Sequence, residues 1–439
     1  MELVRFDDDS PPTSTSLSDA GSGATAAFTE DGKRLAFAVM STPGVWEVRV
    51  ASTPDGEKLD VTWSLPRKTQ PTLVWGGAEA LVADYGDEEA SSVLRVEDGS
   101  LLDIGLGVQV TTAANHSALV AVRDNRILYV GRTSDQWSAA IPGSWLVRLS
   151  TDGSGLALFS QSEVPAFDFP IATTRIQWSP PPPPPCSRVP QSACPETRMM
   201  YTPGEMDWPS IDSRMIVEFD DSGGDKTLMD LAFVPPSKTA TLTAPVASVA
   251  VLRRNWGVQS NGDWFIVTNP NDALTEPWLL NSFQADGKIL RVQGPIAFAQ
   301  YAVSSGDESA VFVISYSRVA EKTTVFAISS PTVKDTEPKA LFSTNQQVNA
   351  LWPQPKGPSI LIETGDPTVP GAPTDTVYFV RNGDTPALSL PKGLGDLQWT
   401  ADGGGFVGTL AGSVLYFSGA TPERPITLGH GRYVLPSQW

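Results

Sequence analysis

The 439-residue sequence predicts an all-β chain folded as a β-propeller, a ring of four-stranded antiparallel blades. Three observations predict this fold. From Thr25 onward, apolar, β-branched and aromatic residues come in short runs bounded by Gly, Pro, Asp or Asn, which is the pattern of strands and turns. No segment carries an apolar stripe of helical period and helical length. Similar units recur at the roughly 40 to 50 residue spacing of propeller blades.

The clearest unit covers residues 25–66. It contains four apolar runs joined by turns at Asp31-Gly32, Pro43-Gly44 and Asp55-Gly56, as expected for one blade of four strands. The last unit, residues 395–429, follows the same plan, with Asp402-Gly403 at its first turn. Both ends of the repeating region therefore carry the same module.

Six further units lie between these two. They begin near Thr72, Val108, Arg175, Val246, Ile296 and Val348. The sequence thus predicts eight blades, with seven as the alternative count. In each unit the second run is continuously apolar, so we expect the second strand to be covered by neighbouring blades on both faces.

Two segments carry a family resemblance. Residues 28–37, FTEDGKRLAF, have an aromatic residue, a Thr, an Asp-Gly turn and then an apolar strand, and residues 399–403, WTADG, repeat the first half. This pattern resembles the blade signature of TolB-like and WD-repeat-like propellers. The resemblance implies a propeller fold and, because such families are mostly scaffolds, a role in protein contacts.

The domain organisation predicted from composition has three parts: a flexible leader at 1–24, the propeller at 25–430 and a tail at 431–439. A Pro-rich insertion at about 179–206 interrupts the propeller and is too long for a blade turn. We predict that it forms a partner-binding loop; a loop that covers a blade edge is the alternative. The candidate binding residues are Arg188, Glu205, Met206 and Trp208.

The insertion holds the two cysteines of the chain, Cys186 and Cys194. The sequence predicts a disulfide between them, with two free thiols as the alternative. A disulfide indicates an oxidising compartment, so we expect an extracytoplasmic protein that is periplasmic, secreted or on the cell surface. The N-terminus lacks a signal-peptide pattern, which fits removal of a signal or, alternatively, a cytosolic chain.

The formal net charge of −18 argues against nucleic acid as a partner, because binding to a phosphate backbone depends on Lys and Arg. No apolar run is long enough to be a transmembrane helix. The partners we expect are another protein or further copies of this chain.

Residues for common catalytic sites are scarce. Only two histidines occur, His116 and His430, and neither lies near a nucleophile motif or a set of metal ligands. The sequence therefore predicts no catalytic residues and no cofactor. Calcium is the one metal with candidate ligands, at Asp220, Asp221 and Asp225, although a solvated acidic turn explains the same residues.

The function that these features favour is a non-catalytic protein-binding scaffold or a subunit of an extracytoplasmic assembly. Two alternatives stay open at this point. One is a carbohydrate-binding or carbohydrate-active propeller that uses the central funnel, and the other is a self-assembling structural subunit.

Overall fold

The structure is a computed structural model, and every regular element in its described part is a β-strand. The described residues are 2–5, 13–16, 25–29, 31–52, 59–77, 79–113, 117–123, 126–130, 135–137, 145–160, 171–178, 202–210, 212, 215–220, 226–231, 239–242, 247–249, 256–259, 263–269, 277–284, 288–329, 336–365, 376–381 and 386–431.

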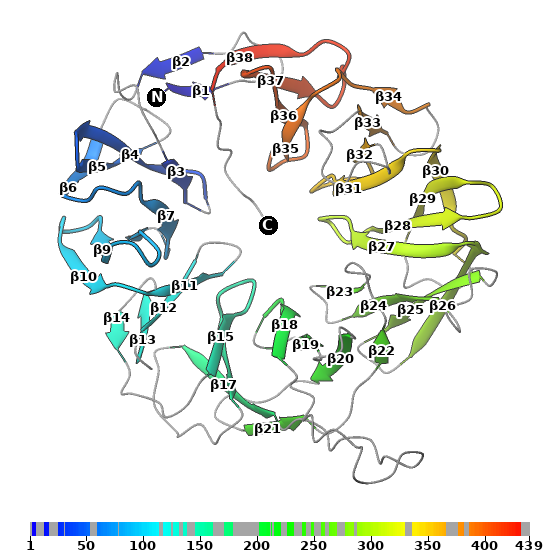
Figure 1. Cartoon of the computed structure of the whole chain (residues 1–439), viewed down its shortest axis with the longest axis horizontal. Coiled ribbons are helices and arrows are strands. Elements are labelled where there is room, and N and C mark those ends of the chain that lie inside the picture. The colour runs from blue at the N-terminus through cyan, green and yellow to red at the C-terminus, as the bar shows by residue number, and fades with distance from the viewer. Residues whose placement is uncertain are drawn as a thin grey trace, which may run out of the picture.

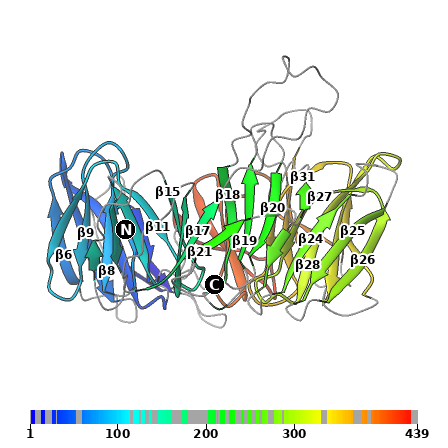
Figure 2. The ribbon, with the colours of Figure 1, turned by 90° about the horizontal axis from the view of Figure 1, so that it is seen from below.

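The strands form a ring of sheets (Figure 1), and the side view shows that the ring is flattened (Figure 2). Nine four-stranded sheets occur in the described part of the chain. In most sheets the first strand lies toward the centre of the ring and the last strand at its outside (Figure 1). The chain is therefore a β-propeller, as the sequence predicts.

We number the sheets in chain order. Sheet 1 contains β3 (Thr25–Phe28), β4 (Arg34–Thr42), β5 (Val45–Ser52) and β6 (Leu59–Leu65). Sheet 2 contains β7 (Thr72–Trp75), β8 (Ala80–Asp84), β9 (Ser91–Arg95) and β10 (Leu101–Gly105). Sheet 3 contains β11 (Gln109–Thr112), β12 (Leu119–Arg123), β13 (Arg126–Val130) and β14 (Asp135–Trp137).

The middle sheets exchange strands. Sheet 4 contains β15 (Trp145–Leu149), β16 (Gly155–Ser160), β17 (Ala172–Trp178) and β21 (Thr239–Leu242). Sheet 5 contains β18 (Thr202–Asp207), β19 (Met215–Asp220), β20 (Lys226–Leu231) and β22 (Ala247–Val249). The chain thus leaves sheet 4, forms three strands of sheet 5, returns to sheet 4 and then completes sheet 5.

The remaining sheets are again contiguous in sequence. Sheet 6 contains β23 (Trp256–Val258), β24 (Trp264–Thr268), β25 (Pro277–Phe283) and β26 (Ile289–Ile296). Sheet 7 contains β27 (Phe298–Ser304), β28 (Ala310–Ser317), β29 (Lys322–Ser329) and β30 (Lys339–Thr344). Sheet 8 contains β31 (Gln347–Pro353), β32 (Ile360–Gly365), β33 (Thr376–Val380) and β34 (Leu388–Ser389). Sheet 9 contains β35 (Gly395–Trp399), β36 (Gly405–Leu410), β37 (Ser413–Ser418) and β38 (Ile426–His430).

The predicted count of eight blades is not confirmed, since the described residues form nine four-stranded sheets. The difference arises between residues 108 and 249, where the sequence suggested two units and the structure has three sheets. Sheet 4 also departs from the predicted antiparallel plan, because β17 is parallel to both β16 and β21. A parallel pair needs a long connection, and long segments do separate these strands in sequence.

The hydrophobic core lies between the sheets. A separate cluster of buried side chains joins each sheet to the next, from sheets 1 and 2 through to sheets 8 and 9. The second strands supply much of it: in β28 the six residues from Ala310 to Ser315 are all buried. This confirms the expectation that second strands are covered on both faces.

Two strands precede the ring. β1 (Glu2–Arg5) and β2 (Thr13–Ser16) pair with each other as a two-stranded antiparallel sheet. The segment predicted to be a flexible leader thus contains paired strands. In the part of the chain that the structure describes, no helix is long and apolar enough to cross a membrane.

Candidate functional site

Four turns of the ring share one hydrogen-bonded design, and each joins the first strand of its sheet to the second. These Ser/Thr–Asp turns are Thr29–Arg34, Ser150–Gly155, Ser305–Ala310 and Thr400–Gly405. A Ser or Thr opens each turn, and an Asp follows two residues later. Short polar side chains of this kind favour turns because they bond to the backbone close by.

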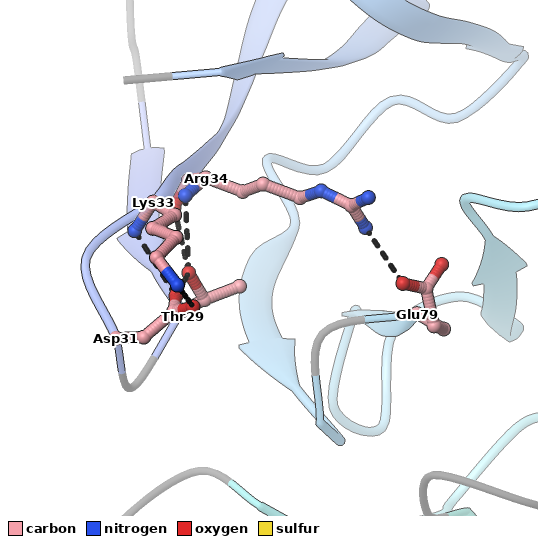
Figure 3. Close-up of polar contacts among 5 residues, drawn as sticks. All are labelled: Thr29, Asp31, Lys33, Arg34 and Glu79. Carbon is pink, nitrogen blue, oxygen red and sulfur yellow. Dashed lines mark hydrogen bonds and ion pairs between the residues drawn. The ribbon is translucent and has the colours of Figure 1, made fainter. Parts of the chain in front are cut away.

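The turn of sheet 1 shows the design (Figure 3). Thr29 Oγ1 donates to Asp31 Oδ1 at 2.8 Å and accepts from the backbone N–H of Arg34 at 3.1 Å. The same Asp31 oxygen accepts from the backbone N–H of Lys33 at 3.0 Å. One hydroxyl and one carboxylate oxygen thereby satisfy the backbone donors of the turn and fix its shape.

The other three turns repeat these bonds closely. The hydroxyl-to-carboxylate distance is 2.8 Å from Ser150 to Asp152, 2.8 Å from Ser305 to Asp307 and 2.7 Å from Thr400 to Asp402. In each turn the opening hydroxyl also accepts the backbone N–H of the residue five positions on, at 2.9 to 3.0 Å. The four turns are therefore one structural element used in sheets 1, 4, 7 and 9.

Hydrogen bonds also link the turns of adjacent sheets. These turns all join the first strand of a sheet to the second, and we call the surface that they form the turn face. From sheet 3 to sheet 4, Ser117 Oγ donates to the carbonyl of Asp152 at 3.1 Å. From sheet 4 to sheet 5, the Thr151 N–H donates to the carbonyl of Trp208 at 2.8 Å. From sheet 5 to sheet 6, Asp207 Oδ2 accepts the N–H of Val258 at 3.1 Å.

The second half of the ring is linked in the same way. Gln259 Nε2 donates to the carbonyl of Glu308 at 3.3 Å, from sheet 6 to sheet 7. Asp307 Oδ2 accepts the N–H of Gly357 at 3.0 Å, between sheets 7 and 8. Gln354 Nε2 donates to the carbonyl of Gly403 at 2.7 Å, from sheet 8 to sheet 9. These bonds hold neighbouring turns in fixed relative positions.

Sheets 1 and 2 are joined by two hydrogen bonds and an ion pair. Trp75 Nε1 donates to the carbonyl of Ala27, and Trp63 Nε1 donates to the carbonyl of Gly99, both at 2.9 Å. Arg34 Nη1 lies 3.2 Å from Glu79 Oε1, across the space between the two sheets (Figure 3). Both side chains are partly exposed, at 29 % and 41 %. A pair with this much solvent contact contributes positioning more than stability.

An open cleft of about 360 Å³ lies on the turn face between sheets 8 and 9. Phe379 and Trp399 line its inner part and are almost fully buried. Lys356 and Arg381 line its exposed part. Arg381 donates from Nη2 to the carbonyls of Gly419 and Ala420, and its guanidinium stands 5.7 Å from the Phe379 ring centre. The cleft therefore offers two cations above an aromatic floor.

The aspartates of two turns in this region are held in the ionised form. The backbone N–H of Gly404 and the hydroxyl of Thr400 lower the pKa of Asp402, and Lys356 adds a smaller effect in the same direction. Burial raises the pKa of Asp307, but hydrogen bonds outweigh burial, chiefly those from the side chains of Ser309 and Ser305, and the pKa lies below its ordinary value. Both carboxylates thus act as fixed hydrogen-bond acceptors at neutral pH.

The structure places two of the predicted loop residues in the fold itself. Met206 belongs to strand β18 and packs, partly buried, against the core cluster between sheets 4 and 5. Trp208, directly after that strand, is only 3 % exposed and belongs to the same core cluster as Phe159 and Met215. This is a correction, because Met206 and Trp208 are core side chains here rather than tips of a loop.

The other predicted site residues are only partly covered. Glu205 lies in strand β18, and Asp220 is the last residue of strand β19. Arg188, Cys186, Cys194, Asp221 and Asp225 lie outside the described residues. The disulfide, the binding loop and the calcium site therefore stay predictions. Within the described residues, no group of three or more His, Cys, Asp or Glu side chains is placed to hold a metal ion.

Sequence reasoning found the turns at Thr29 and Thr400 but missed those at Ser150 and Ser305. The recurring signal was present as Ser or Thr, any residue, Asp, then Gly or Glu, at Thr29, Ser150, Ser305 and Thr400. The copy at Ser150 marks sheet 4, which the predicted units did not separate. The cleft residues Lys356 and Arg381 had no such signal, because it is strand pairing within sheet 8 that places the β31–β32 turn beside the end of β33.

No family model matches the sequence, and no curated protein matches it. Solved structures similar to this one include the Dos1 propeller, with 11 % identity and a TM-score of 0.41, covering 90 % of this chain and 92 % of that one. Another is the Swd1 β-propeller domain of Myceliophteria thermophila, with 10 % identity and a TM-score of 0.35, covering 97 % and 98 %. A third is a putative TolB from Agrobacterium tumefaciens, with 11 % identity and a TM-score of 0.31, covering 69 % and 88 %. The likeness to these proteins is one of fold.

Proposed function

We propose that this propeller is a non-catalytic protein-binding scaffold whose turn face is the binding surface. The observation that carries the proposal is the hydrogen bonding of turns from one sheet to the next, which includes Ser117 to Asp152 and Gln354 to Gly403. A surface fixed in this way loses little conformational entropy when a partner binds, and preorganisation of this kind raises affinity.

The cleft between sheets 8 and 9 supplies an anchor on that surface. Lys356 and Arg381 suit a carboxylate of the partner, and the Phe379 and Trp399 rings below suit its aliphatic stem. We propose that an acidic side chain of the partner protein enters this cleft. The positive charge at the cleft is local, because the chain as a whole is acidic, with a formal net charge of −18.

We also propose an extracytoplasmic location. The support comes from the sequence, in which Cys186 and Cys194 lie close together in a Pro-rich segment that suits a disulfide-closed loop.

The test uses the tagged full chain as bait in an extract of the source organism, followed by chemical crosslinking and mass spectrometry. Lys356→Glu reverses the charge at the cleft. Lys322→Glu is the matched control, because Lys322 is also exposed but begins β29, the third strand of sheet 7, at the end of that sheet opposite the turn face.

We expect a protein partner that wild type and Lys322→Glu both capture, with crosslinks to turn-face residues, and that Lys356→Glu loses at least about tenfold. Thermal unfolding of the three proteins should agree, which would show that the loss is not caused by misfolding. Crosslinks confined to the opposite face, equal capture by both variants, or no enriched protein at all would contradict the proposal.

A further inference from the structure

The outer edge of sheet 2 exposes an unusual amount of apolar surface. Of the six large apolar side chains that are exposed in the described residues, three fall within 101–106: Leu101 at 46 %, Leu102 at 44 % and Leu106 at 57 %. The outer strands β26 and β38 each expose one large apolar side chain, Ile289 and Ile426, among polar ones. Contiguous exposed leucines on a soluble fold are typical of a contact surface.

The backbone of the same segment is open on one side. Among the described strands, β10 is the last of its sheet and pairs with β9 alone, and near its end the Ile104 carbonyl accepts a hydrogen bond from Arg123 of sheet 3. The Arg95 N–H donates to the carbonyl of Ser100. Because hydrogen-bonded and non-hydrogen-bonded pairs alternate along an antiparallel ladder, the backbone N–H and C=O of Leu102 point toward β9. The N–H and C=O groups of Leu101 and Asp103 accordingly point away from the sheet. An open strand edge is a template for pairing with another strand.

Acidic residues surround this edge. Between positions 84 and 107 the chain has seven acidic residues and one basic residue, Arg95. Two arginines from elsewhere also contact β10: Arg67 pairs with Asp103 at 3.4 Å, and Arg123 donates to the Ile104 carbonyl. Glu97 and Asp98 directly precede β10 and are exposed. At the other end of the strand, Asp87 lies beside Gly107, where a Cβ atom would stand 3.9 Å from Asp87 Oδ1. Negative charge is thus present at both ends of the leucine segment.

We propose that the edge of β10 binds an extended segment of a partner protein, with alternating apolar and basic side chains, by strand addition. Backbone groups of Leu101 and Asp103 pair with the added strand, and its apolar side chains cover Leu101 on one face of the sheet. The aliphatic stems of its basic side chains cover Leu102 on the other face, and their charged ends reach toward Glu97, Asp98 and Asp87. This surface lies on the outer strand of sheet 2 and is independent of the turn face.

A second copy of the chain is the less suitable occupant. Two β10 edges pairing antiparallel with each other would bring Glu97 and Asp98 of one copy near Asp87 of the other. Like charges at close range oppose such pairing. A basic segment gains from the same arrangement.

The experiment measures binding of a fluorescent synthetic peptide of alternating Val and Lys to the full chain by anisotropy. Two further peptides separate the contributions: one has Glu in place of Lys, and one has Pro in place of every second Val, which removes backbone donors. The protein variants are Leu101→Ser/Leu102→Ser at the β10 edge and, as the matched control, Ile289→Ser at the exposed outer strand β26 of sheet 6.

We expect the Val/Lys peptide to bind wild type and Ile289→Ser alike, within about twofold, and the double Ser variant at least about tenfold more weakly. The Glu and Pro peptides should bind at least about tenfold more weakly to wild type. Hydrogen exchange should show added protection at the amides of Leu101 and Asp103. Because both leucines are nearly half exposed, the double variant should keep its melting temperature.

Three results would overturn the proposal. One is no binding of the Val/Lys peptide, and another is equal binding of the Pro peptide, which would mean attraction by charge alone. The third is concentration-dependent self-association that the double Ser variant abolishes, which would make a second copy the occupant.

Discussion

Gln354 connects two sheets through both ends of its side-chain amide. Its Oε1 accepts the N–H of Ser359 at 3.0 Å within the turn of sheet 8, and its Nε2 donates to the carbonyl of Gly403 at 2.7 Å in the turn of sheet 9. The residue thus takes the place of the hydroxyl in a Ser/Thr–Asp turn and adds a bond to the next sheet. The glutamine side chain is longer than that of Ser or Thr, so it can make both the bond within its own turn and the bond to the next sheet.

Gln354→Ala should lower the free energy of unfolding by about 1 to 2 kcal/mol, because it leaves a partly buried donor and acceptor without partners. Chemical denaturation measures the change. Gln347→Ala, at an exposed position of the same sheet, is the control and should stay within about 0.5 kcal/mol of wild type. An equal decrease in the free energy of unfolding in both variants would mean that the hydrogen bonds of Gln354 between the sheets do not stabilise the protein.

Glu308→Gly should stabilise the protein by up to about 1 kcal/mol. Glu308 has φ of 59°, at the turn position where Gly32, Gly153 and Gly403 have φ of 66°, 69° and 73°. Glycine adopts this left-handed conformation without the steric cost that a side chain brings. Gly403→Ala is the reverse test and should destabilise by about 1 to 2 kcal/mol. A destabilised Glu308→Gly would show that the Glu side chain compensates for the strain.

Acid should weaken the ring in the range below about pH 5. The pKa values of Asp307 and Asp402 are lowered in the fold, whereas an unfolded Asp has a pKa of about 3.9. Their contribution is therefore complete above the unfolded pKa and is lost as the pH falls through the lower folded values. Denaturation midpoints between about pH 5 and pH 2 should fall less steeply in Asp402→Asn than in wild type. Glu423→Gln, at an exposed turn, should leave the slope unchanged.

The ion pair between Arg34 and Glu79 should contribute little. A double-mutant cycle with Arg34→Gln and Glu79→Gln should give a coupling energy below about 1 kcal/mol, and salt should reduce it further, because both side chains are partly exposed. A coupling above about 2 kcal/mol would mean that this link stabilises sheets 1 and 2 as strongly as a buried pair would.

Cys186 and Cys194 should be oxidised in protein purified without reductant from an oxidising compartment. Thiol titration after denaturation would then find no free thiol, and reduction should increase the mass by two hydrogens. Two free thiols in such a preparation would contradict the predicted disulfide and remove the main support for an extracytoplasmic location.

Local patterns predicted the fold well. Asp31-Gly32 and Asp402-Gly403 lie at the turns where the sequence suggested them, and the apolar second strands are buried. Trp208, a candidate binding residue in the sequence, is buried in a core cluster that also contains Phe159 of the preceding sheet. Nothing local to residue 208 encodes that position.

By itself the sequence determined that the chain is all-β, that its strands come in repeated groups of four and that both ends carry the same turn. These features depend on residues close together in the chain, so apolar runs and turn residues encode them. Only the tertiary structure decided the nine sheets of the described part, the parallel pairing of β17 with β21, the links between turns and the cleft lined by Lys356 and Arg381. These depend on packing and hydrogen bonding between segments far apart in sequence, and no local pattern specifies which distant partner a strand or turn will meet.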